Sequence, residues 1–584
     1  MLNISFKHNR FFTRYHLKST FIIMLENYKI FKIYLLLFAL TFSWMSCSKG
    51  KNNGTTTAEE KMEAAIQTDS AFVEKYVRQE PEFKQNRNVI MKFYRDRSYR
   101  LGWFKDDKLV PQANTFISVI NRAGREGLNP NDYKIKNFNA LFKRYEDDKL
   151  EDSVRYKLKQ EIDVALTASY MHYASDFYRG TINPREVDQI DWTVRKNKIK
   201  LNKALETILQ ERDSRYPYYQ FEPLHPEYNR LRTALQQYRN IKQQGGWPKI
   251  EGISKLKLGD TSNVVSLLRQ RLLPQQRWNV NRPVPNQYDE ELANAVKDFQ
   301  WRHGLKADGS IGPATLKLMN VSIDDRIDQI IINMERWRWI PKPKKFEEKH
   351  IFVNIPEYML YARDKGKTVM SMRVIVGKTM NSTPIFSDKV EYIVFSPYWN
   401  VPASIVANEF KPKLLNDPGW LDRMDMEVLN GFGKNAQPIS PYNVDWASVT
   451  EKNLKYRIRQ RPGPDNPLGD IKFIFPNEHE VYLHHTASEA LFDQTQRGFS
   501  HGCIRVEKPV DLAKFLLQDQ PQWGESEIIE AMHAGEEKYQ NLKATVPVYI
   551  VYFTSWVDDN GAIHFRDDLY GHDKVLEKEY FASN

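Results

Sequence analysis

Hydrophobic and polar positions follow different spacings in successive regions of the chain. Between about residues 71 and 250, apolar residues recur at helical spacing, as they do at positions 156–178, so we expect a helical domain there. The carboxylates of this region are scattered among Lys and Arg, which predicts a solvated helical surface rather than a catalytic site. The region therefore has the character of a scaffold.

Three shorter helices are predicted within residues 255–322. The first carries an apolar stripe at Val264, Leu267, Leu268 and Leu272. The second carries Leu292, Val296 and Phe299, with Asp289 placed to cap its start. The third begins at Pro313, a favoured first-turn position, and carries Leu316 and Met319. The spacing by itself predicts a small three-helix domain.

From about residue 350 the pattern changes to strands. β-Branched or aromatic runs bounded by Gly, Pro and Asn occupy residues 350–355, 368–376, 390–395, 480–483 and 546–554. Residues 403–460 interrupt this series of predicted strands. They include a predicted helical stretch at 402–415 and are rich in Gly, Pro and Asn. Since long insertions between strands are often lids, we expect a flap over a site. The predicted fold class is multidomain α+β, with a helical N-terminal region, a small three-helix domain and a mostly β domain.

Composition narrows the class of protein further. The 584 residues suggest about three or four domains, and a mean hydropathy of −0.62 excludes a polytopic membrane protein. The net charge is +11, but the first 47 residues hold six Lys or Arg against Glu26 alone. No long basic block follows them, so a nucleic-acid partner is not expected.

The N-terminus resembles an export signal. Residues 34–45 form an uncharged apolar run of twelve residues behind Lys29 and Lys32, too short to span a bilayer. The run ends at Cys47 and resembles a bacterial lipoprotein signal, in which that cysteine is lipidated; Met24 is an alternative start. An ordinary cleaved signal or an uncleaved anchor are the alternatives. We therefore expect residues 1–47 to be a signal, residues 48–70 a tether, and the protein to face the periplasm.

The other cysteine has the surroundings of a nucleophile. The chain contains two cysteines, Cys47 and Cys503, which excludes a disulfide framework. An imidazole can take the proton of a thiol and hold the charged pair, and three histidines lie close in sequence: His484, His485 and His501. Gly502 lets the backbone bend, so that amides around positions 502 and 503 face a developing oxyanion. The alternatives are a buried structural cysteine and a zinc site, but zinc-ligand spacing is missing.

Two segments resemble known families. Leu-Gly-Asp at residues 258–260, Phe-Gln at 299–300 and the run at 304–316 resemble the peptidoglycan-binding domain of cell-wall enzymes. A three-helix scaffold without ligand binding is the alternative for residues 255–322. Ser-His-Gly-Cys-Ile-Arg at 500–505, with an upstream Leu-His-x-Thr at 483–486, resembles the YkuD-type L,D-transpeptidases. Residues 333–341, 395–402, 462–469, 472–477 and 549–570 resemble their long, YcbB-type branch.

The resemblance implies a fold, an activity and roles for particular residues. It implies a catalytic domain at residues 330–575 with a capping insertion at 403–460, acting on peptidoglycan stem peptides without a cofactor or metal. Cys503 would be the nucleophile and His484 the base, oriented by the carbonyl of His485. The resemblance assigns a site-shaping or oxyanion role to Ser500, His501 and Gly502, and substrate contacts to Tyr482, His485 and Arg505.

The implied reaction releases the terminal D-alanine of a tetrapeptide stem and forms a 3–3 crosslink. Two other classes of function remain open at this point. One is a cysteine peptidase or carboxypeptidase that trims wall peptides with water as the acceptor. The other is a non-catalytic lipoprotein that anchors the wall through Cys47 and residues 309–316. Ser48 follows Cys47 in place of an acid, which slightly favours the outer membrane.

Overall fold

The computed structural model describes residues 67–105, 107–187, 192–193, 199–210, 225–273, 286–340, 349–433 and 435–582. The predicted signal run, Cys47 and most of the tether lie outside the described residues. None of the described helices is long and apolar enough to cross a bilayer.

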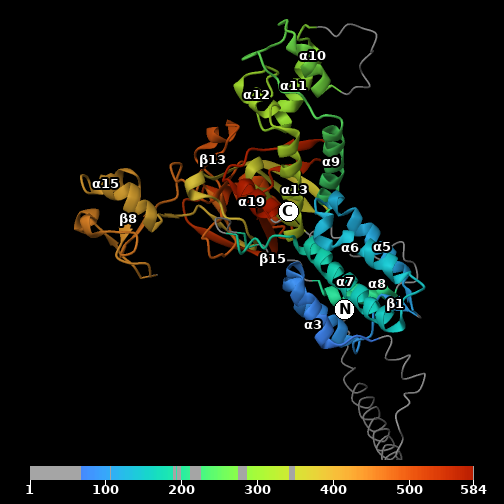
Figure 1. The fold of residues 1–584 in the computed structure, drawn as a ribbon. Helices are drawn as coiled ribbons and strands as arrows, with labels where there is room; N and C mark the ends of the chain where they lie inside the picture. The colour runs from blue at the N-terminus through green and yellow to red at the C-terminus, as the bar shows by residue number, and fades with distance from the viewer. Residues whose placement is uncertain are drawn as a thin grey trace, which may run out of the picture. The chain divides into compact units, whose positions relative to one another are not determined.

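The N-terminal region is helical, as predicted, and packs around one long helix (Figure 1). Its elements are α3 (Ser70–Gln79), α4 (Arg87–Asp96), the hairpin β1 (Phe104–Lys105) and β2 (Lys108–Leu109), α5 (Pro111–Asn121), α6 (Ile135–Tyr145), α7 (Asp152–Arg179) and α8 (Leu201–Gln210). Helix α7 is buried on nearly all sides from Leu158 to Tyr178. It therefore forms the centre of this region's hydrophobic core.

The carboxylates of this region were predicted to lie on a solvated surface, and this prediction is wrong for two residues of α7. Asp163 is completely buried and accepts hydrogen bonds from the Tyr94 hydroxyl at 2.6 Å and the Trp103 amide at 2.7 Å. Asp176 is also buried and accepts from the Tyr133 hydroxyl at 3.1 Å. Both carboxylates satisfy interior donors, which explains why they are tolerated in a core.

The three predicted helices of residues 255–322 are confirmed. They are α10 (Val264–Leu272), α11 (Glu290–Arg302) and α12 (Pro313–Met319), and they share a hydrophobic core of their own. The Asp289 carboxylate accepts the Leu292 amide at 3.0 Å, so Asp289 caps α11 as its position predicted. The sequence was sufficient to predict these three helices because the apolar stripes and the start signals at Asp289 and Pro313 lie within or next to the helices themselves.

Two further helices belong to the core of the C-terminal sheet. They are α9 (Pro226–Gln243) and α13 (Ile323–Trp339), whose buried residues join those of the strands in one cluster. Helix α13 starts with a capping box between Ser322 and Asp325. The residues predicted as one helical domain, 71–250, thus contribute to three cores: α9 belongs to that of the C-terminal sheet, and Ile250 to that of the three-helix region.

The C-terminal region contains a nine-stranded sheet in the order β13-β5-β14-β12-β11-β6-β15-β3-β4, and β4 also pairs with β5. The strands are β3 (His350–Asn354), β4 (Met359–Asp364), β5 (Lys367–Gly377), β6 (Ser387–Phe395), β11 (Ile471–Ile474), β12 (Leu483–His484), β13 (Gly498–Ser500), β14 (Ile504–Val506) and β15 (Lys538–Val551). Accompanying elements are α17 (Pro509–Leu516), α18 (Glu525–Met532), β16 (Ser555–Val557), β17 (Ile563–Phe565) and α19 (His572–Ala582). This mostly β region confirms the predicted fold class.

One predicted strand was wrong at its start. Residues 480–483 were expected to be extended, but the strand begins at Leu483 and Glu480 has a left-handed φ of 54°. The Asn477 side chain explains the difference, because its oxygen accepts the amides of His479 at 3.0 Å and Val481 at 3.2 Å. A side chain that binds nearby amides in this way favours a turn over a strand.

The insertion at 403–460 has its own small core and its own sheet, in the order β7-β10-β8-β9. Its elements are α14 (Ala403–Ile405), the π-helix η9 (Val406–Phe410), α15 (Lys411–Leu414), α16 (Trp420–Arg423), β7 (Trp399–Asn400), β8 (Met426–Leu429), β9 (Pro438–Ile439) and β10 (Arg457–Gln460). The helical stretch predicted at 402–415 is confirmed. The sheet was not anticipated.

Candidate active site

Two parallel strands bring the predicted site residues onto one face of the sheet. Strand β12 pairs with β14 so that Leu483 lies opposite Ile504 and His484 opposite Arg505. Because side chains alternate along a strand, Leu483 and Ile504 point into the core, and His484 and Arg505 point to the other face. Cys503, two positions before Arg505, continues that face next to Tyr482, whose carbonyl accepts the Ile504 amide at 3.1 Å.

His484 is oriented by the backbone of the next residue. Its Nδ1 lies 2.5 Å from the carbonyl oxygen of His485, which assigns the proton to Nδ1 and leaves Nε2 as an acceptor. The ring is buried, and burial together with the Arg505 charge lowers the pKa of His484 to about 3. The imidazole is therefore neutral, the form that can take a proton.

Cys503 is partly exposed, and its thiol lies against the turn before β12. Its Sγ is 3.9 Å from the carbonyl oxygen of Glu480. Burial raises the pKa of Cys503 above its usual range, and hydrogen bonds from Tyr482 and the Arg505 charge oppose that rise. Burial thus favours the neutral forms of both the thiol and the imidazole.

The turn before Cys503 is fixed by hydrogen bonds around Ser500. The Ser500 hydroxyl donates to the Cys503 carbonyl at 2.5 Å and accepts the Gly502 amide at 3.1 Å. Gly502 has a φ of 116°, which a residue with a Cβ rarely adopts, and its carbonyl accepts from the Thr383 hydroxyl at 2.8 Å. Of the two amides expected at the oxyanion, the one on Gly502 is already bonded. The Cys503 amide donates to no described residue.

The other two histidines have acidic partners of their own. His501 is exposed, and its Nε2 lies 3.0 Å from a carboxylate oxygen of Glu409 on η9, in the insertion. The His485 ring lies between Asp470 at 3.3 Å and Glu489 at 3.2 Å. Burial lowers the pKa of His485, but these two carboxylates outweigh it and raise the pKa overall. Carboxylates thus partner both rings.

Several residues at the site were not found from the sequence. They are Thr383, Glu409, Asp470, Glu480 through its carbonyl, and Gly469. Gly469 has a φ of 59°, and a Cβ there would come within 2.5 Å of the His485 ring. Among these residues, only Gly469 could have been noticed in the sequence, because it ends the Asn-Pro-Leu-Gly run of residues 466–469. Among the described residues, no group of three or more His, Cys, Asp or Glu is placed to hold a metal ion.

Comparisons with known proteins identify the family of the chain. Three family models match: the L,D-transpeptidase catalytic domain at residues 348–550, the Scaffold domain at 88–235, and the "Putative peptidoglycan binding domain" at 261–319. A protein of Haemophilus influenzae named "Putative L,D-transpeptidase" is 30% identical over 356 residues, which are 59% of this chain and 70% of that protein.

Solved structures of the same class match more distantly. An L,D-transpeptidase from Mycobacterium smegmatis matches at 10% identity with a TM-score of 0.17, covering 35% of this chain and 58% of that one. L,D-transpeptidase 3 from Mycobacterium tuberculosis, in complex with a faropenem-derived adduct, matches at 12% identity with a TM-score of 0.17, covering 35% and 59%. The family is shown by the family models and by the Haemophilus protein. The chain belongs to the L,D-transpeptidase family.

Proposed function

We propose that this protein forms 3–3 crosslinks in peptidoglycan through a thioester on Cys503. The observation that supports the proposal is the pairing of β12 with β14, in which His484 lies opposite Arg505, two positions after Cys503. A thiol and a neutral imidazole are the two groups that nucleophilic attack with general-base assistance needs.

The first half-reaction acylates Cys503. The sulfur attacks the carbonyl carbon between the third residue of a tetrapeptide stem and its terminal D-alanine, while His484 Nε2 takes the thiol proton. The Cys503 amide is free to stabilise the oxyanion, and the Ser500 hydroxyl holds the turn that presents this amide. The C–N bond then breaks, the leaving amine receives the proton from His484, and D-alanine departs. A thioester remains on Cys503.

The second half-reaction transfers the acyl group. An amine on a neighbouring stem attacks the thioester carbon, and His484 takes a proton from that amine. The C–S bond breaks as the new amide bond forms, and His484 returns the proton to the departing sulfur, which restores the thiol and the neutral imidazole. Tyr482 and Arg505 lie on the same face and can contact the stem. The insertion reaches the site loop through Glu409 and His501, so it can cover the stem and exclude water.

The central test is covalent labelling followed by product analysis. A carbapenem, whose strained lactam carbonyl a thiolate can open, should add once to the wild-type protein and not to Cys503→Ser. Incubation with purified tetrapeptide muropeptides should give crosslinked dimers and free D-alanine. Shortened monomers without dimers would show a carboxypeptidase, and an adduct that persists in Cys503→Ser would place the nucleophile elsewhere.

Attachment to the membrane is a separate part of the proposal. The Met-Ser-Cys sequence after the apolar run supports lipidation at Cys47, which would hold the enzyme in the cell envelope. Cys47→Ala should lose lipid labelling and signal processing in cells, and Ser46→Ala, which keeps a small residue before the cysteine, should retain both. Equal labelling of Cys47→Ala and the wild type would exclude this anchor.

A further inference from the structure

The side chain of His485 is held at both nitrogens of its ring. Its Nδ1 lies 3.3 Å from a carboxylate oxygen of Asp470, directly before β11, and its Nε2 lies 3.2 Å from Glu489 on the 3-10 helix η12 (Glu489–Asp493). The Asp470 side chain is 24% exposed and that of Glu489 73%, so water screens the contact with Asp470 less. Both ring nitrogens therefore have protein partners, which leaves neither as a free contact for a stem peptide.

The ring keeps these partners in either protonation state. When the ring is charged, both nitrogens donate, Nδ1 to the Asp470 carboxylate and Nε2 to Glu489. When it is neutral with its proton on Nε2, Nδ1 accepts the backbone amide of Asp470, which lies 3.4 Å away. The bridge between Asp470 and Glu489 therefore does not depend on the charge of His485.

The backbone beside Asp470 makes room for this ring. A Cβ on Gly469 would come within 2.5 Å of His485 Nδ1, which is closer than van der Waals contact allows. Gly469 also has a left-handed φ of 59°, the region that glycine adopts without strain. A larger residue at position 469 would have to displace the imidazole.

These contacts restrict the backbone of residue 485. Its amide donates to the Ile471 carbonyl at 2.9 Å, and its ring is held at both ends. A carbonyl turns with its peptide plane, so anchors on the amide and on the side chain limit the direction in which it points. This carbonyl oxygen lies 2.5 Å from His484 Nδ1. If it turned away, the proton of His484 could move to Nε2, the atom that the proposed mechanism needs as an acceptor.

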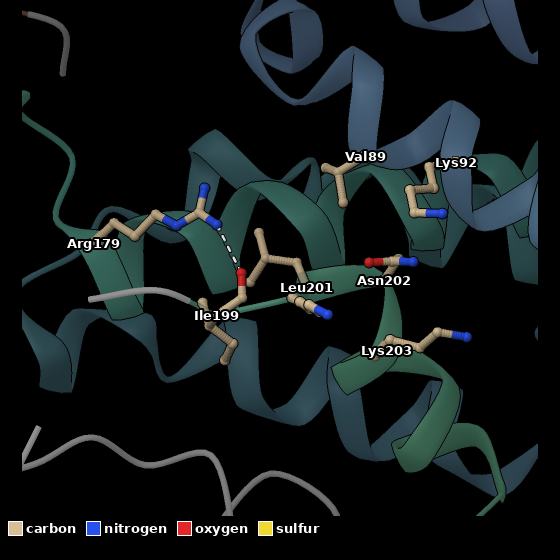
Figure 2. A pocket seen from close by; sticks show the side chains of 8 residues that line it. Val89, Lys92, Arg179, Ile199, Leu201, Asn202 and Lys203 are labelled. Atoms are coloured by element: carbon tan, nitrogen blue, oxygen red, sulfur yellow. Dashed lines mark hydrogen bonds between the residues drawn. The ribbon is translucent and has the colours of Figure 1, made fainter. Parts of the chain in front are cut away.

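Ion pairs within one helix do not act on the backbone in this way. Lys92 and Lys203 line a cavity of about 430 Å³ at the start of α8 (Figure 2), and they pair with Asp96 at 3.0 Å and Glu206 at 2.8 Å. Each partner lies three or four positions away on the same helix, whose own hydrogen bonds already fix the backbone. The bridge of His485 instead joins two separate segments across the residue whose carbonyl holds the imidazole.

We propose that the side chain of His485 positions the base: bridged to Asp470 and Glu489, it fixes the carbonyl that keeps the proton of His484 on Nδ1. His485 is then a positioning residue, in place of the substrate contact that the sequence resemblance implies. The inference rests on the proposed function, in which His484 is the base for Cys503.

The test measures how fast a carbapenem acylates the full chain, by rapid quenching and intact mass over a range of carbapenem concentrations. Two constants result, the maximal rate of acylation and the concentration that gives half of it. The variants are His485→Ala and His485→Gln. One matched control is His533→Ala, which removes another histidine 3.8 Å from Asp470. The other is Glu206→Gln, which breaks the ion pair of Lys203, a residue labelled in Figure 2.

His485→Ala should lower the maximal rate by about tenfold, because a base that is no longer held in place takes the proton less often. The half-saturating concentration should stay unchanged, because the ring does not touch the substrate. His485→Gln should recover part of the rate, since its amide can still bond to the Asp470 amide or to Glu489. Both controls should equal the wild type in both constants.

Gly469→Ala provides a second readout, which separates positioning from folding. It should lower the maximal rate in the wild-type background, because its Cβ displaces the ring, and should not lower the rate further in His485→Ala. Its melting temperature should fall in both backgrounds, because the left-handed backbone strains an alanine whether or not the ring is present.

Three results would overturn the inference alone, with Cys503 still labelled and His484→Ala still slow. The first is a wild-type maximal rate in His485→Ala. The second is a raised half-saturating concentration with an unchanged maximal rate, which would make His485 a substrate contact. The third is an additive loss in the double variant of Gly469 and His485, which would place the effect outside the ring. An unlabelled wild-type protein would instead overturn the proposed function, and the inference with it.

Discussion

At the scale of single residues, burial favours the uncharged forms of the two groups that we propose to react. Burial lowers the pKa of His484 to about 3 and raises the pKa of Cys503. In the proposed mechanism, attack therefore moves one proton from sulfur to Nε2 between two groups that are both neutral at the start.

This arrangement predicts the pH dependence of acylation. The second-order rate constant for a carbapenem, followed by intact mass, should be nearly flat from about pH 5 to 8, without an inflection near the ordinary histidine pKa. His484→Ala should lower the rate at pH 7 by roughly two orders of magnitude, the usual contribution of a general base.

The same variant provides the control. Without the imidazole only spontaneously ionised thiolate reacts, so the rate in His484→Ala should rise about tenfold per pH unit towards the raised thiol pKa. A wild-type profile that rises with this slope would mean that His484 is not the base.

At the scale of elements, a π-helix places Glu409 beside the site loop. Residues 403–414 form one helical run whose middle, η9, is widened to the π form just before Pro412. Proline has no amide proton to complete an α-helical bond, and π-turns often occur at functional sites. The widened turn keeps Val406 and Phe410 in the insertion's core while Glu409 contacts His501.

The contact between Glu409 and His501 is exposed, so its contribution is small. An exposed pair is worth less than about 1 kcal/mol, and we expect Glu409→Gln and His501→Gln each to slow acylation by less than about tenfold. The double variant should be no slower than either single one, because both remove the same contact. A loss in His501→Gln as large as that in His484→Ala would contradict these roles.

At the scale of the whole molecule, one buried ion pair ties distant segments to α13. Arg338 and Glu335 are both fully buried and 2.7 Å apart. Arg338 also donates to the Glu126 carbonyl at 2.5 Å, and Glu335 accepts the Ile182 amide at 2.9 Å. These bonds connect the 3-10 helix after α5, which ends at Glu126, and the segment after α7, which contains Ile182, with the helix that enters the core of the catalytic sheet.

Breaking this pair should destabilise the protein as a whole. Arg338→Met leaves Glu335 buried without its counter-charge, and we expect the free energy of unfolding to fall by about 3–5 kcal/mol in denaturant titrations. Adding Glu335→Gln, which removes the charge and keeps an oxygen for the Ile182 amide, should restore part of the loss. A single variant as stable as the wild type would show that the pair is dispensable.

Signals that act within a few residues were enough to predict most elements. The three helices α10, α11 and α12 are present as predicted. The signals that predicted them lie within the helices or next to them: the apolar stripe from Val264, the cap at Asp289 and the first-turn Pro313. The strand at residue 480 was misplaced because the Asn477 side chain organises a turn that periodicity does not register. The roles of Cys503 and His484 stay predictions; the strand pairing puts His484 opposite Arg505, two positions after Cys503. Glu409 could not be placed beside His501, 92 positions away, before the fold was known.

The raised pKa of Cys503 also bears on how long the enzyme survives. Peroxides oxidise thiolates, not thiols, and an enzyme of the cell wall works outside the reducing cytoplasm. A desolvated sulfur that stays protonated until a substrate arrives is a poor target for such oxidants. For the nucleophile that we propose, the burial that favours the protonated sulfur would therefore also slow the formation of sulfenic acid on Cys503.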